Sequence, residues 1–245
     1  MNYLSILAIF KNETMNLKLW IDHYLWQGVE HFYLIDNDSD DNPLDILQEY
    51  IDAGVVTYSF KPEKHIQTTH YRNMFNEQKI KQNTHWLIVC DLDEFFFGVD
   101  KRLKTKLMQL DNYYDIVICN WKMFGSNGLI THPQDMRLEI TQRVKQLNVN
   151  TKYIVKTNMI ESENIEIHNV NNAIHRKRTA NHLIQLNHYP IQSLYYFQTV
   201  KMTRGAADTH INVRDMDYFN RYNENTDYND EILKNLILSP PDNYL

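Results

Sequence analysis

The sequence predicts a single α/β domain, in which a mostly parallel central sheet is flanked by helices and accompanied by a small mixed second sheet. In the first half of the 245 residues, short β-rich runs alternate with segments of helical periodicity. This order is typical of a parallel sheet wrapped by helices. The 43% of hydrophobic residues is enough for one sizeable core, and no linker rich in Pro, Gly or Ser divides the chain.

The first strand is predicted at residues 3–10, an apolar run rich in Leu and Ile. A helix follows, because apolar residues recur at helical spacing from Leu17 to Leu25. Thr14 is its predicted N-cap and Gly28 its stop. A strand followed directly by an amphipathic helix is the first half of a parallel unit.

The second strand is predicted at residues 31–35 and opens into an acidic turn at residues 36–41. A helix from Pro43 to just before Gly54 leads to a third strand. The later predicted elements are a third strand at 55–60, a polar helix at 69–81, a buried central strand at 85–90, a helix at 103–110, a strand at 115–124, a glycine turn at 125–128, and short strands at 153–155 and 183–186. The fold is expected to stop being strictly parallel after Asp93.

The C-terminal part of the chain differs in composition from the rest. From Asp208 onward it is rich in Asn, Asp and Tyr and holds two short helical patterns. We therefore expect a main domain at residues 1–205 and a helical appendage at residues 206–245, packed on the same domain.

Charge and hydropathy exclude several classes of protein. The net charge of −6 and the scattered Lys and Arg leave no basic stripe for a nucleic-acid backbone. A mean hydropathy of −0.54 without a long apolar run predicts no membrane span. The first residues lack the basic leader of a signal peptide, and Cys90 and Cys119 lie in apolar runs as expected of buried thiols. We expect a soluble, cytoplasmic protein.

Unusual polar clusters follow three of the predicted strands: residues 11–13, residues 36–38 and residues 91–94. In an open α/β sheet, ligands bind beyond the carboxyl ends of the strands. Two carboxylates one residue apart, here Asp91 and Asp93, can present oxygen ligands to a divalent cation, which in turn can hold a diphosphate. An Asp-x-Asp triplet alone is also compatible with a solvated acidic loop.

The ordered succession KNE, GVEHFYLIDNDSDD, HWLIVCDLDEFF, NWKMFGSNG, KYIVKT, His168 and NHYPIQSLYYFQTVKMTRG resembles glycosyltransferase family 92 and its bacterial and viral relatives. The resemblance runs from Leu4 to about Gly205. It implies a GT-A type fold, in which the Asp-x-Asp motif and Mn²⁺ or Mg²⁺ bind the diphosphate of a nucleotide sugar. It further implies UDP as the nucleotide and transfer of a hexose-type sugar, with inversion, to a glycan or other acceptor.

The resemblance also implies roles for individual residues. Asp93 would bind the metal, and Asp91 would contact the metal, its water shell or the ribose. His188, at the end of an apolar strand, is the predicted third metal ligand and His168 its alternative, because neutral imidazole suits Mn²⁺. The positions expected to surround the nucleoside are Asn12, Glu13, Asp36 and Asp38.

Two further pairs of residues each allow a functional and a structural interpretation. Lys201 and Arg204 lie three apart on one predicted helix face and would reach the leaving diphosphate, unless they form a solvated helix edge. Trp121 and Phe124, beside the glycine turn, either form a floor for a sugar ring or belong to the core.

An inverting transferase needs a general base, and an Asp or Glu is expected. The unranked candidates are Asp135, Glu139, Glu161 and Glu163. Two other functions stay open: a nucleotidyltransferase or phosphohydrolase that uses the same carboxylate-bound metal, and a non-catalytic sugar-binding module. The donor sugar, the acceptor and the oligomeric state are not predicted.

Overall fold

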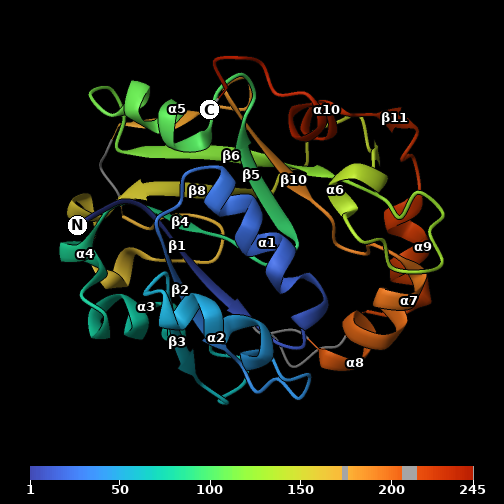
Figure 1. The fold of residues 1–245 in the computed structure, drawn as a ribbon, viewed down its shortest axis with the longest axis horizontal. Helices are drawn as coiled ribbons and strands as arrows, with labels where there is room; N and C mark the ends of the chain where they lie inside the picture. Colours follow the sequence, from blue (N-terminus) through green and yellow to red (C-terminus); the bar gives the residue numbers. More distant parts are fainter. Residues whose placement is uncertain (173–175, 206–213, 245) are drawn as a thin grey trace.

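The structure is a computed structural model that describes residues 1–172, 176–205 and 214–244. Within these residues a nine-stranded sheet runs through the molecule in the order β3-β2-β1-β4-β8-β6-β10-β5, with β9 beside β6 (Figure 1). The parallel strands of its first part are β1 (Asn2–Phe10), β2 (His31–Asp36), β3 (Val56–Phe60) and β4 (Thr84–Val89). The strands of its mixed part are β5 (Glu94–Gly98), β6 (Ile116–Met123), β8 (Thr151–Lys156), β9 (Lys177–Thr179) and β10 (Ile184–His188).

Helices cover both faces of the sheet, and β1 shows why. Its alternate side chains enter two separate hydrophobic clusters: Ile6 and Ala8 pack with residues of α1, whereas Leu7 and Ile9 pack with residues of α3. A strand buried on both faces reads as a continuous apolar run, as this one does. The helices of this half are α1 (Thr14–Trp26), α2 (Leu44–Asp52), α3 (Gln67–Glu77) and α4 (Ile80–Asn83).

The later helices are short and gather mainly on one side of the molecule (Figure 1). They are α5 (Leu103–Leu110), α6 (Met136–Glu139), α7 (Leu194–Tyr196), α8 (Met202–Arg204), α9 (Met216–Asn223) and α10 (Ile232–Leu238). Short 3₁₀ turns occupy Thr157–Met159 and Ser162–Asn164, and a π-helical turn at Phe197–Lys201 joins α7 to α8. The two-stranded antiparallel sheet of β7 (Gln142–Arg143) and β11 (Tyr228–Asn229) is separate from the main sheet.

The predicted α/β class is confirmed, and most predicted elements lie within a few residues of their expected places. Some details were wrong. Thr14 is the first residue of α1 and not its cap; Glu13 precedes it without a capping hydrogen bond. The acidic turn supplies the missing acceptor, because the Asp41 carboxylate accepts the Thr14 backbone N–H at 2.8 Å. The predicted polar helix is broken at Lys79, whose φ is +50°.

Strand β5 was not predicted at all. It follows directly after the Asp91–Asp93 turn, and all five of its residues are buried. It runs antiparallel to β10, and His188 lies opposite Glu94. This pairing brings the end of one strand and the start of the other to the same point, which is where the predicted site residues lie.

The segment expected to be an appendage contacts the main domain at several points. In the part of the segment that the structure describes, β11 pairs with β7, and Tyr244 is fully buried. The Tyr244 hydroxyl accepts a hydrogen bond from Nε2 of Gln27, the residue that follows α1, at 2.9 Å and donates one to the Gly98 carbonyl at 3.0 Å. Residues 206–213 and Leu245 lie outside the described residues, and the proposed boundary at residue 205 stays a prediction.

Candidate active site

The turn between β4 and β5 carries the acidic residues, and α1 holds its backbone. The indole N–H of Trp20 donates to the carbonyl of Asp91 at 3.2 Å and to that of Glu94 at 3.1 Å. The hydroxyl of Tyr24 also donates to the Glu94 carbonyl, at 3.0 Å. Both side chains are fully buried. The shape of this turn is therefore set by buried side chains of the first helix.

Asp91 is paired with a buried lysine. Lys152 of β8 is 0% exposed, and its ammonium lies 2.9 Å from Asp91 Oδ2 and 3.6 Å from Glu94 Oε2. Burial raises the pKa of Asp91, but Lys152 outweighs burial and leaves the pKa below its ordinary value. Burial raises the pKa of Glu94 well above its ordinary value. Burial lowers the pKa of Lys152, but the two carboxylates outweigh it and raise that pKa.

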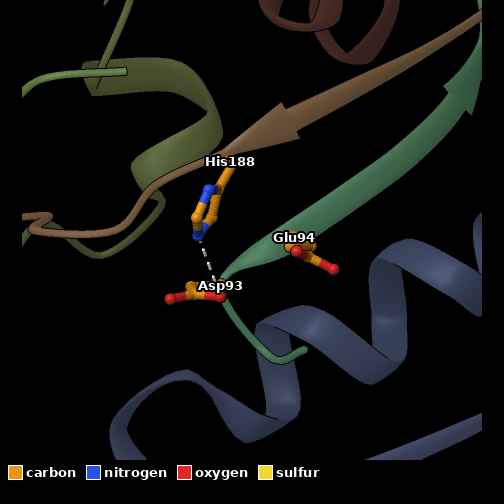
Figure 2. A group of neighbouring side chains, drawn as sticks. All are labelled: Asp93, Glu94 and His188. Atoms are coloured by element: carbon orange, nitrogen blue, oxygen red, sulfur yellow. Dashed lines mark ion pairs between the residues drawn. The ribbon is translucent and has the colours of Figure 1, made fainter. Parts of the chain in front are cut away.

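Asp93 faces a histidine and a second lysine. His188 Nε2 lies 3.5 Å from Asp93 Oδ1, and the Lys201 ammonium forms an ion pair with Asp93 Oδ2. Burial raises the pKa of Asp93, but Lys201 and His188 outweigh it and hold the pKa well below its ordinary value. Figure 2 shows His188 pointing at Asp93, while the Glu94 carboxylate extends to the other side of the strand.

The residues at this point fit a divalent metal ion. Asp93, Glu94 and His188 each offer one ligand atom within 4.8 Å of the others. Among the described residues, two of their buried polar atoms, Glu94 Oε1 and His188 Nδ1, have no hydrogen-bond partner, which is unusual for native interiors. Carboxylate oxygen and imidazole nitrogen are suitable ligands for Mn²⁺. Of the three, only Asp93 and His188 also border the cavity described next.

A cavity of about 330 Å³ opens at the carboxyl ends of β1 and β4. Three carboxylates border it: Glu13, Asp91 and Asp93. Cationic side chains border it as well, namely Lys11, Lys201, Arg204 and Arg214. Polar and aromatic side chains from other elements complete its wall: Asn37, Gln67, Trp121, Asn150, His168 and Tyr218. A cavity of this charge can accommodate an anionic ligand together with a cation.

The predicted site residues divide into two groups. Those that border the cavity are Glu13, Asp91, Asp93, His168, His188, Lys201 and Arg204. Asn12, Asp36 and Asp38 do not border it; their side chains form contacts around the acidic turn instead, where Asn12 Oδ1 accepts from Asp40 N at 2.9 Å. The Asp36 carboxylate accepts from Ser39 N and Tyr58 Oη, and Asp38 pairs with Lys11 at 3.0 Å. Asn37, which lies between them, is the residue of this turn that borders the cavity.

The Glu13 carboxylate is engaged in contacts with neighbouring side chains. Its carboxylate forms an ion pair with Arg204 and accepts hydrogen bonds from the Tyr196 hydroxyl at 2.7 Å and from Asn16 Nδ2 at 2.9 Å. It is 1% exposed. Glu13 therefore ties the start of α1 to α8 and orients Arg204 at the edge of the cavity.

None of the four base candidates borders the cavity; they are Asp135, Glu139, Glu161 and Glu163. Asp135 caps α6 and pairs with Arg137 at 2.6 Å. Glu161 pairs with Lys81, and Glu139 and Glu163 are exposed to solvent. Their assignment rested on position along the chain alone, and as base candidates they stay untested.

Several residues that border the cavity or pair with its carboxylates were not predicted. Lys152 was recognised only as part of the KYIVKT run, although a lysine in a strand of apolar residues was a usable signal. Tyr218 and Tyr222 come from α9, in the segment expected to be an appendage. Trp121 borders the cavity, whereas Phe124 packs on Tyr189 with ring centroids 4.7 Å apart.

A family model named Glycosyltransferase family 92 matches residues 4–236. The chain belongs to glycosyltransferase family 92. The match continues past Gly205, where the resemblance seen in the sequence had ended, and includes α9. The observed sheet with helices on both faces fits the GT-A type fold expected of this family.

Other relatives of this family 92 chain are more distant. A glycosyltransferase family 92 protein of Ricinus communis is 27% identical over 157 residues, which cover 56% of this chain and 26% of the plant protein. The structure of S. aureus TarS 1–349 is 13% identical, with a TM-score of 0.48 over 97% of this chain and 72% of that one. The same fragment in complex with UDP is 16% identical, with a TM-score of 0.43 over 64% and 47% of the two chains.

The family 92 chain thus matches about a quarter of the length of its plant relative. Among the residues that the structure describes, no helix combines the length and the apolar character needed to cross a bilayer.

Proposed function

We propose that this chain is a metal-dependent glycosyltransferase. It moves a hexose-type sugar from a nucleoside-diphosphate sugar, with UDP as the nucleotide, to a hydroxyl group of a glycan or other acceptor, and inverts the anomeric centre. The observation that carries the proposal is the pairing of Asp93 with His188 beside Lys201 and Arg204, in a cavity at the strand ends of a family 92 chain.

The chemistry of the cavity wall supports this assignment. Asp93 and His188 would hold Mn²⁺ or Mg²⁺, which neutralises charge on the diphosphate when it is bound. Arg204, oriented by Glu13, and Lys201, which lies against Asp93, place cationic donors at the same end. Such donors stabilise the negative charge that develops on a departing diphosphate. Asp91, held by Lys152, presents an ionised carboxylate to the same cavity.

Ligand-induced stabilisation separates the transferase from its rivals. A ligand at 100 times its Kd stabilises the folded state by about 2.7 kcal/mol. The transferase predicts that UDP with Mn²⁺ raises the melting temperature more than either alone, and that the protein releases UDP from one donor in a panel of UDP-sugars. Release of inorganic phosphate or formation of a nucleotidyl product would indicate the rival enzymes. A response to free sugars but not to UDP would indicate a binding module.

Replacing Asp93 tests the metal end directly. Asp93→Asn keeps the shape of the side chain but removes the charge that a divalent ion needs. Metal stabilisation is worth several kcal/mol, so turnover should fall by at least about 100-fold, with a matching loss of Mn²⁺ affinity in calorimetry. Asp22→Asn removes a carboxylate from the exposed Lys18–Asp22 pair of α1 and serves as the control. Full activity and unchanged Mn²⁺ affinity in Asp93→Asn would contradict the proposal.

A further inference from the structure

The cavity has a metal end, but its carboxylates offer no free base. Among the described residues, each carboxylate that borders the cavity is paired with a cation: Glu13 with Arg204, Asp91 with Lys152, and Asp93 with Lys201. A carboxylate held by a buried cation is a weak proton acceptor, because the cation stabilises its ionised form. An inverting transfer therefore needs another group in this wall.

His168 has the geometry of a proton acceptor. It borders the cavity, and its Nδ1 lies 3.3 Å from the carbonyl oxygen of Thr151. A carbonyl oxygen can only accept a hydrogen bond, so Nδ1 carries the hydrogen and the lone pair is on Nε2. This orientation by a backbone carbonyl leaves the second ring nitrogen available.

The segment that carries His168 is fastened to the sheet. Thr151 Oγ1 donates to the His168 carbonyl at 3.1 Å, and the Tyr153 hydroxyl donates to the Glu166 carbonyl at 2.8 Å. An isolated bridge joins Ile165 to Val170 across the segment. The imidazole is therefore presented from a short loop that β8 holds at two points.

His168 is also distinct from the metal end. It is not part of the Asp93, Glu94 and His188 group, whose ligand atoms all lie within 4.8 Å of one another. Trp121 contacts both imidazoles, with ring centroids 5.2 Å from His168 and 4.2 Å from His188. Partial burial against the cavity wall, followed by the charge of Lys152, lowers the pKa of His168 from its ordinary value of 6.5. A lowered pKa favours the neutral ring, which is the form that can accept a proton.

We propose that His168 is the general base of the transfer, an inference that rests on the proposed function. Its Nε2 takes the proton of the acceptor hydroxyl while the hydroxyl oxygen forms the bond to the anomeric carbon. The bond between that carbon and the diphosphate oxygen breaks, and its electron pair leaves with the nucleoside diphosphate. The proton ends on His168, and no other reagent is required.

The test uses the full chain and the UDP-sugar from which the wild type releases UDP. His168→Gln removes the basic nitrogen and should lower turnover by about 10²–10⁴-fold, the contribution of a positioned base. Its affinities for UDP and for Mn²⁺, measured by calorimetry, should stay within about threefold of the wild type, since the proposal gives His168 no part in holding either. His182→Gln, an exposed histidine that does not border the cavity, is the matched control.

Three results would overturn the assignment of His168, and they are distinguishable. Turnover of His168→Gln at the wild-type rate would show that His168 is not the general base. A loss of Mn²⁺ affinity that matches the loss of turnover makes His168 a metal ligand. A larger loss of turnover in Asp135→Asn, Glu139→Gln, Glu161→Gln or Glu163→Gln moves the base to that residue. If the wild type neither binds UDP nor releases it from any donor, the proposed function itself is wrong, and the assignment of His168 as its general base is then wrong as well.

Discussion

A buried lysine organises the acidic turn at the scale of single residues. Lys152 is enclosed between Asp91 and Glu94, and neither its own ammonium nor the Glu94 side chain reaches solvent. Removing one member of a buried charge cluster leaves the remaining charges uncompensated. The stability lost in this way exceeds the net stability that the intact cluster contributes. The state of Asp91 in the cavity therefore depends on a residue that the cavity does not touch.

Lys152→Met should lower the free energy of unfolding by about 3–5 kcal/mol, because Asp91 and Glu94 lose their shared cation. The double variant with Glu94→Gln removes one of the uncompensated groups and should recover part of that loss. Urea denaturation of the wild type, both single variants and the double variant gives the coupling between the two residues. Additive effects in this cycle would show that Lys152 does not act through Glu94.

At the scale of elements, the local sequence pattern predicts the helices and strands whose periodicity shows their burial. It does not predict a strand whose formation depends on pairing with a distant segment. β1, α1 and β4 were predicted because their periodicity reflects burial on one or two faces. β5 was missed because it is only five residues long and directly follows the acidic turn, and because its partner β10 lies far along the chain. The site residues follow the same rule. Asp91 and Asp93 were predicted because they directly follow a recognisable strand, whereas Lys152 and the tyrosines of α9 were missed because they reach the site from distant parts of the chain.

Tyr244 tests whether the C-terminal segment is part of the same folding unit. Tyr244→Phe removes the hydroxyl that links Gln27, just after α1, to the Gly98 carbonyl of β5 and leaves both groups without this partner. The expected cost is about 1–3 kcal/mol of unfolding free energy, measured as a shift of the single urea transition. Tyr113→Phe, at a side chain that is 65% exposed, should change stability by less than about 0.5 kcal/mol. Equal stabilities would show that the segment is only loosely attached.

At the scale of the whole molecule, buried ion pairs set the dependence of stability on pH. Asp230 is 6% exposed and lies 2.7 Å from Arg143 and 3.1 Å from Lys122. Burial raises its pKa, but the two cations outweigh burial and lower the pKa below its ordinary value of 3.8. A carboxyl whose folded pKa lies below its unfolded pKa stabilises the protein fully above the unfolded value and loses this contribution as pH falls through the folded value.

The contribution of Asp230 to the unfolding free energy should therefore be complete above about pH 4 and be lost as the pH falls below that value. Asp230→Asn should be less stable at pH 7, and its stability should depend less steeply on pH between about 4 and 2, because one shifted carboxyl is missing. Guanidinium denaturation at a series of pH values measures both effects. The same acid slope in the variant and the wild type would assign the pH dependence to other carboxyls.

The position of β10 between β6 and β5 also fixes the order in which the protein can mature. Residues 94–98 gain their partner only when residues 184–188 have been synthesised, and pairings of such long range form slowly. A nascent chain that ends before His188 already holds Asp91 and Asp93, yet it lacks the imidazole, Lys201 and Arg204. The candidate site is thus complete only after β10 and the helices that follow it have been synthesised.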